Sequence, residues 1–157
     1  MAAQTLTHLP LPYTLFFLYI EPFSTIVGAI YAHFAQHTYL QLTHAPSAPI
    51  LSAVPTATSI ALTQLANLYL AFTLNEALVL RATRDVRVWR ALLFGLLVAD
   101  FGHLYSVNLK GLQVYYDVLG WNAIDWGNVA FVYCGATMRI CFLLGVGLGG
   151  KSEKKRK

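Results

Sequence analysis

The chain has 157 residues, of which 57% are hydrophobic and 11% are charged, and its formal net charge is +4. Soluble domains carry about 25% charged residues, so this composition indicates a membrane protein. The length is that of one domain and leaves no room for a large soluble domain between the apolar runs. The basic residues flank apolar runs rather than lying among aromatic residues on a polar face, so we expect no nucleic-acid partner.

Four apolar runs are each long enough to cross about 30 Å of hydrocarbon, which takes about 20 helical residues. They cover residues 11–34, 57–80, 89–108 and 126–148. We therefore predict an all-α fold, an integral membrane four-helix bundle that forms one domain at residues 1–150, followed by a basic cytosolic tail at residues 151–157. The first run is too long for a cleavable signal, so we expect it to remain as an anchor.

Arginine and lysine clusters set the expected orientation. The turn between the second and third runs carries Arg81, Arg84 and Arg87, and the tail ends in KKRK at residues 154–157. Because basic residues favour the cytosolic side, both clusters and both termini should be cytosolic. The terminal lysines also match the dilysine pattern that retrieves proteins to the endoplasmic reticulum, which predicts a multi-pass protein of that membrane. The alternative interpretation is an ordinary basic flank.

Charged side chains inside the apolar runs are the best guide to function, because a charge at the bilayer centre costs roughly 3 kcal/mol or more. At 1.5 Å per residue, Glu21, Asp100 and Arg139 lie about 13–16 Å from the cytosolic ends of their helices. We predict an ion pair between Asp100 and Arg139, which can be functional or merely interhelical glue. Glu76 is expected to stand apart, nearer the cytosolic side, and neither Glu21 nor Glu76 has a predicted cationic partner.

Two neighbours extend this group of charges. Pro22 should kink the first helix beside Glu21 and open room for a cavity, because proline removes one helical hydrogen bond. The alternative is a lone protonated Glu21 bonded to a neighbouring helix. His103 follows Asp100 by one helical turn and shares its face.

Aromatic and amide side chains lie near the acids. Tyr69 and Phe72 share a helical face with Glu76, and Asn75 is the residue directly before Glu76. Tyr105 lies close to Asp100 on the third predicted helix. Carboxyl groups with aromatic walls suit the protonation of a carbon–carbon double bond and the shelter of the resulting carbocation. The same lining suits passive binding of an amphiphilic amine or a sterol. We expect these aromatic and amide residues, together with Arg139, to contact the ligand.

Three histidines, His33, His37 and His44, lie in or near the loop after the first run. Their spacing does not resemble a zinc motif, and no cysteine or acid lies near them. We therefore expect a wet interface there, and no metal and no cofactor in the protein.

Three segments resemble the EXPERA group, the family of the sigma-2 receptor and the emopamil-binding sterol isomerase: LFFLYIEPF at residues 15–23, LNE at residues 74–76 and VRVWR at residues 86–90. The resemblance implies four or five spans, cytosolic termini and a pocket within the membrane that holds a sterol or a cationic ligand. It also implies that Glu21 and Glu76 face this pocket. The histidine that the family isomerase carries near its second-helix glutamate has no counterpart here. The first segment is also similar to small fungal membrane proteins of unknown function.

Two functions agree with these features. The first is an isomerase or proton-initiated cyclase of a sterol or isoprenoid, in which Glu21 or Glu76 is the acid and Asp100 with His103 is the base or cation stabiliser. Arg139 would keep Asp100 ionised. The alternative is a non-catalytic sterol- or lipid-binding accessory or scaffold protein, and a transporter is a third option. The expected partners are a hydrophobic small molecule, membrane lipid, and either a second copy of the chain or a membrane enzyme.

Overall fold

The computed structural model describes residues 5–6, 8–51 and 53–148, and this part of the chain is built from helices, as the all-α prediction requires. In the element labels, η marks a π-helix at η1, η3 and η7 and a 3₁₀-helix elsewhere. The elements in chain order are α1 (Leu11–Leu15), η1 (Phe16–Ile20), α2 (Glu21–Phe34), α3 (Gln36–His44), η2 (Ala45–Ser47), α4 (Thr56–Leu74), η3 (Asn75–Val79), α5 (Leu80–Ala82), α6 (Val86–Ser106), η4 (Val107–Lys110), η5 (Leu112–Tyr115), η6 (Val118–Gly120), α7 (Ala123–Asp125), η7 (Trp126–Phe131) and α8 (Val132–Leu143).

Three continuous helices are long and apolar enough to cross a membrane, at Leu11–Phe34, Thr56–Ala82 and Val86–Lys110. They contain 24, 27 and 25 residues, so at 1.5 Å per residue each is about 36–40 Å long. The fourth predicted run, residues 126–148, does not form a further helix of this length within the described residues. It folds as a shorter helical segment, residues 123–143, made of α7, η7 and α8.

Two capping motifs explain where these helices differ from the predicted bounds. The third helix begins at Val86, because Asp85 Oδ1 accepts a hydrogen bond from the Arg87 backbone N–H at 2.9 Å. The Arg87 guanidinium also bonds to this carboxylate, and both contacts hold the pKa of Asp85 below its usual range.

The fourth segment ends at Leu143 and not at residue 148, because Gly145 adopts a φ of 80°. The N–H of Val146 then bonds to the carbonyl of Cys141, and the N–H of Gly145 bonds to the carbonyl of Phe142, each at 2.9 Å. These two bonds form a Schellman motif, which stops a helix.

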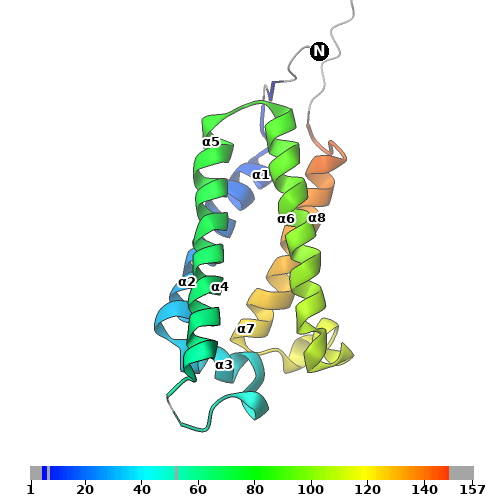
Figure 1. The fold of residues 1–157 in the computed structure, drawn as a ribbon. Coiled ribbons are helices and arrows are strands. Elements are labelled where there is room, and N and C mark those ends of the chain that lie inside the picture. The colour runs from blue at the N-terminus through cyan, green and yellow to red at the C-terminus, as the bar shows by residue number, and fades with distance from the viewer. Residues whose placement is uncertain (1–4, 7, 52, 149–157) are drawn as a thin grey trace, which may run out of the picture.

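The helices form two pairs, with α2 packed along α4 and α6 packed along α8 (Figure 1). The beginning of α1 and the end of α8 lie at the same end of the molecule as the turn between α5 and α6. At the opposite end, α3 contacts α7, and the Asn122 side chain donates a hydrogen bond to the Leu42 carbonyl at 2.7 Å. The predicted basic tail and its dilysine pattern, residues 151–157, lie outside the described residues.

An aromatic core fills the space near the α5–α6 turn. Phe17 and Phe142 are 0% exposed, Trp89 stacks on Phe142 with ring centroids 5.5 Å apart, and Tyr13 meets the same ring edge-on at 5.4 Å. The polar atoms of these rings are satisfied, since Tyr13 donates to the Val146 carbonyl at 2.9 Å. This core joins α1, α6 and α8 and fixes the end of the molecule next to the charged residues.

Candidate functional site

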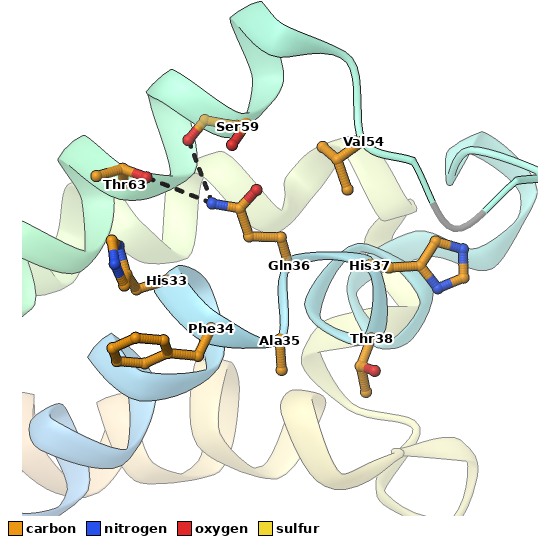
Figure 2. Close-up of a pocket in the computed structure, with 9 residues that line it drawn as sticks. All are labelled: His33, Phe34, Ala35, Gln36, His37, Thr38, Val54, Ser59 and Thr63. Carbon is orange, nitrogen blue, oxygen red and sulfur yellow. Dashed lines mark hydrogen bonds between the residues drawn. The ribbon is translucent and has the colours of Figure 1, made fainter.

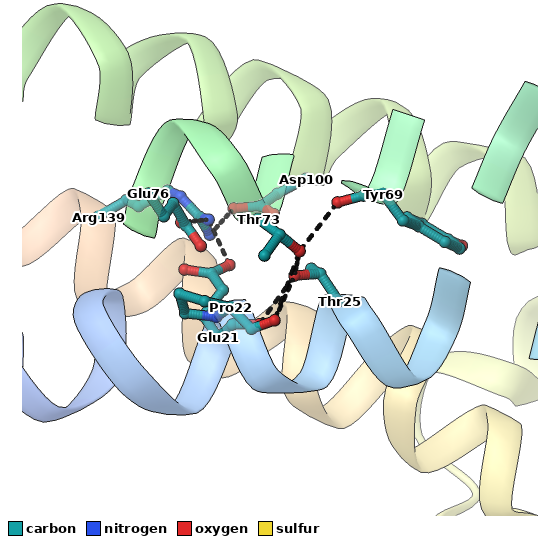
Figure 3. A network of polar contacts seen from close by, with 8 residues as sticks. All are labelled: Glu21, Pro22, Thr25, Tyr69, Thr73, Glu76, Asp100 and Arg139. Atoms are coloured by element: carbon teal, nitrogen blue, oxygen red, sulfur yellow. Dashed lines mark hydrogen bonds and ion pairs between the residues drawn. The ribbon is translucent and has the colours of Figure 1, made fainter. Parts of the chain in front are cut away.

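Arg139 of α8 lies at the centre of a buried cluster of three carboxyl groups, which we call the charge cluster (Figure 3). Its Nη1 donates to Asp100 Oδ2 at 2.7 Å, and its Nη2 donates to Glu76 Oε1 at 3.3 Å and also to Glu21 Oε1. The side chain of Arg139 is 2% exposed and that of Glu76 is 1% exposed. Four helical segments far apart in the sequence therefore each contribute one charged group to a single buried point.

This geometry confirms one prediction and corrects another. The predicted ion pair between Asp100 and Arg139 is confirmed. The prediction that Glu21 and Glu76 lack a cationic partner, with Glu76 standing apart, is wrong, since both bond to the same guanidinium.

The predicted end of the fourth helix accounts for part of this error. Because this helix ends at Leu143, Arg139 lies four residues from its end, or about 6 Å at 1.5 Å per residue, and Glu76 lies six residues, or about 9 Å, from the end of its own helix at Ala82. The same count puts Glu21 about 15 Å from Leu11 and Asp100 about 21 Å from Val86, so the helix ends are not level with one another. The contacts themselves, and not the count from helix ends, place the four groups together.

A π-helical turn accompanies the charged residue in three of the four segments. η1 ends directly before Glu21, η3 contains Glu76, and η7 precedes Arg139 by two helical turns. Such turns interrupt the regular helical hydrogen-bond pattern and occur frequently at functional sites. η1 and η3 therefore lie directly at the charge cluster, whereas η7 lies about 12 Å along its helix from Arg139.

Proline at position 22 is accommodated by one of these π turns. The N–H of Glu21 bonds to the carbonyl of Phe16, five residues earlier. Pro22 has no N–H to offer the carbonyl of Leu18, and this carbonyl accepts a hydrogen bond from the Arg81 side chain instead. The irregularity predicted beside Glu21 thus exists, and an arginine from the neighbouring helix satisfies the freed backbone oxygen.

Threonine hydroxyls join the two helices that carry the glutamates. The hydroxyls of Thr25 and Thr73 share a hydrogen bond of 2.7 Å, and the Thr25 hydroxyl also donates to the carbonyl of Glu21 at 3.0 Å. Thr73 is 5% exposed and bonds in addition to the carbonyl of Pro22 at 3.4 Å. These contacts fix the relative register of α2 and α4 at the level of the charge cluster.

The guanidinium of Arg139 lies against a glycine and an aromatic ring. A Cβ atom at Gly135 would approach Nη1 to 2.6 Å, so glycine is the residue that leaves room for this group. The guanidinium carbon lies 5.9 Å from the ring centre of Phe17, within the range of a cation–π contact. The Gly135 site borders Glu21 as well, since the same Cβ would lie 3.6 Å from Glu21 Oε1, so the bare helix surface leaves room for the ion pair.

A cavity of about 420 Å³ adjoins the charge cluster and is lined by all four of its members. This volume falls within the range of about 300–1,000 Å³ that is usual for small-molecule sites. Most of the remaining wall is apolar or aromatic: Gly28, Leu65, Leu68, Tyr69, Phe72, Leu96, Ala99, Gly127, Phe131 and Val132. Polar side chains enter it from Ser24, Thr25, His103 and Asn128. The arrangement can therefore hold an apolar molecule next to acidic and basic groups.

The predicted ligand contacts divide into two sets. Tyr69, Phe72 and His103 line the cavity with the charge cluster. Asn75 is exposed and does not line it, because one residue before Glu76 on a helix points in a different direction. Tyr105 is 80% exposed and lies beyond the cavity, so these two residues are not placed to contact a ligand there.

Several lining residues were not predicted, although their spacing could have revealed them. Ser24, Thr25 and Gly28 follow Glu21 by three, four and seven residues, which places them on its helical face. Phe131 precedes Arg139 by eight residues and shares its face in the same way. The prediction followed charge and aromatic content, and it therefore missed the small and hydroxylated residues of the wall.

Some polar atoms in this region have no hydrogen-bond partner among the described residues. They are Oε2 of Glu21, Oε2 of Glu76, Nε2 of His103 and Nε of Arg139. Buried polar atoms are usually paired, so each of these four calls for a partner such as water, an ion or a bound ligand, or for a catalytic role. Three of the four belong to side chains that were predicted as acid or base.

A second hollow, of about 700 Å³ and open to its surroundings, lies where α2 meets α3 (Figure 2). Gln36 closes one side by donating to the Ser59 carbonyl at 3.3 Å and to the Thr63 hydroxyl at 3.4 Å. Figure 2 shows the rings of His33 and His37 pointing away from each other on either side of Gln36. Among the described residues, no group of three histidine, cysteine or acidic side chains is placed to hold a metal ion.

The fold and the charge cluster define the class: an all-helical protein with three helices of membrane-spanning length and apolarity, and a buried site of acids around one arginine. The chain belongs to the family described as a domain of unknown function, DUF7704, whose model matches residues 6–149. Comparisons with curated proteins and with solved structures give no match. The resemblance to the EXPERA group stays a prediction.

Proposed function

We propose that this protein is a multi-pass membrane protein of the endoplasmic reticulum that protonates a carbon–carbon double bond of a sterol or isoprenoid held in its cavity. It would act as an isomerase or as a proton-initiated cyclase. The observation that carries the proposal is the convergence of three carboxyl groups and one guanidinium on the wall of a mainly apolar cavity. An apolar substrate and an acid are the two things such a reaction needs.

The formal charge of the charge cluster supports the presence of protonated carboxyl groups, which can act as proton donors. Three carboxylates and one guanidinium carry a formal charge of −2. Each uncompensated charge in a dry interior costs several kcal/mol. The cluster is therefore balanced when two of its carboxyl groups are protonated, and a carboxylic acid in an apolar site is a proton donor.

Glu76 is the best placed donor. Its contact with Arg139 is 3.3 Å, longer than the 2.7–2.9 Å usual for a charged hydrogen bond, whereas Asp100 lies at 2.7 Å. The guanidinium therefore stabilises the carboxylate of Asp100 more than that of Glu76. The second oxygen of Glu76 has no partner among the described residues and is free to carry the transferable proton.

The proposed reaction moves one proton in and one proton out. Glu76 gives its proton to one carbon of the double bond, which forms a C–H bond and leaves a carbocation on the adjacent carbon. The rings of Tyr69, Phe72 and Phe131 line the cavity and stabilise that cation through their negative faces. In an isomerase, His103 Nε2 then removes a proton from a neighbouring carbon, and the double bond forms at the new position. In a cyclase, a second double bond attacks the cation first and closes the ring, and His103 Nε2 then removes a proton from the carbon next to the new cation, whose C–H bond pair forms the final double bond.

The membrane part of the proposal is a four-helix bundle in which residues 123–143 complete the three span-length helices. The arginine turn supports cytosolic termini, since the start of α1 and the end of α8 lie at the end of the molecule that carries this turn. The tail at residues 151–157 supports retrieval to the endoplasmic reticulum through its dilysine pattern. The segments that resemble the EXPERA group agree with a sterol-like substrate.

Turnover of a microsomal lipid extract by the purified protein in lipid nanodiscs tests this proposal. Liquid chromatography with mass spectrometry should show one lipid species replaced by an isomer of equal mass and different retention time. Glu76→Gln should slow the conversion by about 10²–10⁴-fold, the usual contribution of a general acid. Asp117→Asn is the matched control, because Asp117 is an exposed loop residue away from the cavity. If Glu21→Gln, Glu76→Gln and Asp100→Asn all kept full turnover, the proposed mechanism would be wrong.

A second function, non-catalytic binding of a sterol or lipid, is favoured by one observation. All three acids already bond to Arg139, so the charge cluster can serve as a fixed interhelical contact beside a binding cavity. In that case, incubation with the same extract should give saturable binding of one lipid species without conversion. The bound lipid should keep the same mass and structure with the wild type and with each of the three acid substitutions.

A further inference from the structure

Three amide side chains face outward from the helix at Thr56–Ala82. Gln64, Asn67 and Asn75 are all exposed, and none of their side-chain amides makes a hydrogen bond to any part of the chain that the structure describes. Gln64 and Asn67 lie about 12 and 17 Å from Thr56 at 1.5 Å per residue, which is within the part of this helix that lipid would surround. An amide without a partner is strongly disfavoured in hydrocarbon, so the surface requires a polar partner.

The amides belong to one face, which differs from the face that lines the cavity. At 100° per residue, Ala71 and Asn75 each lie about 20° from Gln64, on opposite sides of it, and Asn67 lies about 60° to one side. Tyr69 and Glu76 point about 120–140° away from Gln64. Ala57 and Ala71 lie along the same line, and small residues allow another helix to approach closely.

A groove of about 470 Å³ runs beside this face, between α2 and α4. Its walls include Gln64 and Asn67 from α4 and exposed apolar side chains of α2. These α2 residues are Ile26, Ile30 and Phe34, which are 39%, 49% and 79% exposed. The surface thus combines amide groups, small residues and an apolar groove, which is the composition of a helix–helix contact in a membrane.

We infer that this face is the contact between two copies of the chain. Copies in one bilayer share the same orientation, so a twofold axis along the membrane normal brings each residue opposite its own counterpart at the same depth. An amide side chain both donates and accepts hydrogen bonds, so Gln64 and Asn67 satisfy themselves in such a pair. A different membrane protein would need its own polar groups at these same depths. This inference is independent of the proposed lipid chemistry.

Energy transfer between donor- and acceptor-labelled copies in proteoliposomes, measured over a range of protein-to-lipid ratios, tests the contact. The wild type should dimerise as the ratio rises. The triple variant Gln64→Leu, Asn67→Leu, Asn75→Leu should raise the dissociation constant by about 10–100-fold, because polar contacts between membrane helices supply much of their association. A wild type that stays monomeric at the highest ratio, or a triple variant that dimerises as well as the wild type, would overturn the inference.

Cross-linking gives a second measurement that leaves the amides intact. In a background with both native cysteines replaced by alanine, Ala71→Cys should form an intermolecular disulfide, because this position lies at the centre of the proposed contact. Val98→Cys is the matched control, since Val98 is 55% exposed on α6 and lies at a similar distance from the α5–α6 turn. Failure of Ala71→Cys to cross-link, or equal cross-linking of Val98→Cys, would contradict the twofold contact.

Discussion

Gly135→Ala tests the charge cluster through a single methyl group. A Cβ at this position would lie 2.6 Å from Nη1 of Arg139, whereas ordinary contact begins at 3.4 Å, so the guanidinium would have to move by about 0.8 Å. A free arginine would make this movement easily. Arg139 cannot, because it is 2% exposed and is bonded to three carboxyl groups.

The magnitude follows from the contact that the movement breaks. Nη1 donates to Asp100 at 2.7 Å, and hydrogen bonds to charged groups contribute about 1.5–3 kcal/mol to stability. Alanine is also the better helix former at position 135, by roughly 0.5–1 kcal/mol, so we expect Gly135→Ala to reduce the free energy of unfolding by about 0.5–2.5 kcal/mol. The matched control is Gly95→Ala in the middle of α6, where a Cβ meets nothing within 4 Å. Alanine is the better helix former by roughly 0.5–1 kcal/mol, so the control should be slightly more stable than the wild type.

Thermal unfolding in nanodiscs distinguishes the two variants. At about 2–4 °C per kcal/mol for a chain of this size, Gly135→Ala should lower the melting temperature by about 1–10 °C, while Gly95→Ala should raise it. If Gly135→Ala were as stable as Gly95→Ala, then the guanidinium would not be held where the structure has it, and the account of the charge cluster would be refuted.

Three further predictions concern the buried charge, the core and the tail. Arg139→Met should destabilise the fold by about 3–5 kcal/mol, because it leaves three carboxyl groups buried without a cation, and a loss below about 1 kcal/mol in chemical denaturation would contradict this. Phe142→Ala should cost about 3–5 kcal/mol in the same assay, since Phe142 is 0% exposed, whereas truncation of the 69% exposed Phe23 should change stability far less. Replacing Lys154 and Lys155 by serine should move a fluorescent fusion from the endoplasmic reticulum to later compartments, and unchanged localisation would refute the retrieval signal.

The sequence was sufficient for three of the four predicted helices of membrane-spanning length and for part of the cluster. Run length located the three span-length helices, because hydrocarbon thickness sets the number of apolar residues required. The pairing of Asp100 with Arg139 was also predicted, since a buried charge needs a partner. The residue count was not what made it right, because the observed helix ends lie about 21 Å from Asp100 and about 6 Å from Arg139.

Glu76 could not be placed in the same way. Its depth relative to Arg139 depended on the end of the fourth helix, which a Schellman motif at Gly145 sets five residues before the end of the apolar run. Apolar content does not reveal such a stop. The number of acids around one guanidinium likewise depends on how far the arginine side chain reaches, and residue spacing does not report that reach.

The direction in which a side chain next to an acid points was also predicted wrongly. Asn75 adjoins Glu76 in the chain, but neighbouring positions on a helix point about 100° apart, and Asn75 is exposed on the outer side. Tyr105 is two residues from His103 and turns out of the cavity for the same reason. Proximity in sequence was therefore a poor guide, and spacing of three, four or seven residues was the better one.

Deuterium incorporation tests the central claim most directly, because it asks whether the charge cluster delivers a proton to carbon. The purified protein is incubated with microsomal lipid extract in heavy water, and the mass of each converted lipid is measured. The account predicts one deuterium bound to carbon in the product, present with the wild type and Asp117→Asn and lost with Glu76→Gln. A converted lipid without deuterium, or with the same deuterium content from Glu76→Gln at full rate, would contradict protonation by this cluster.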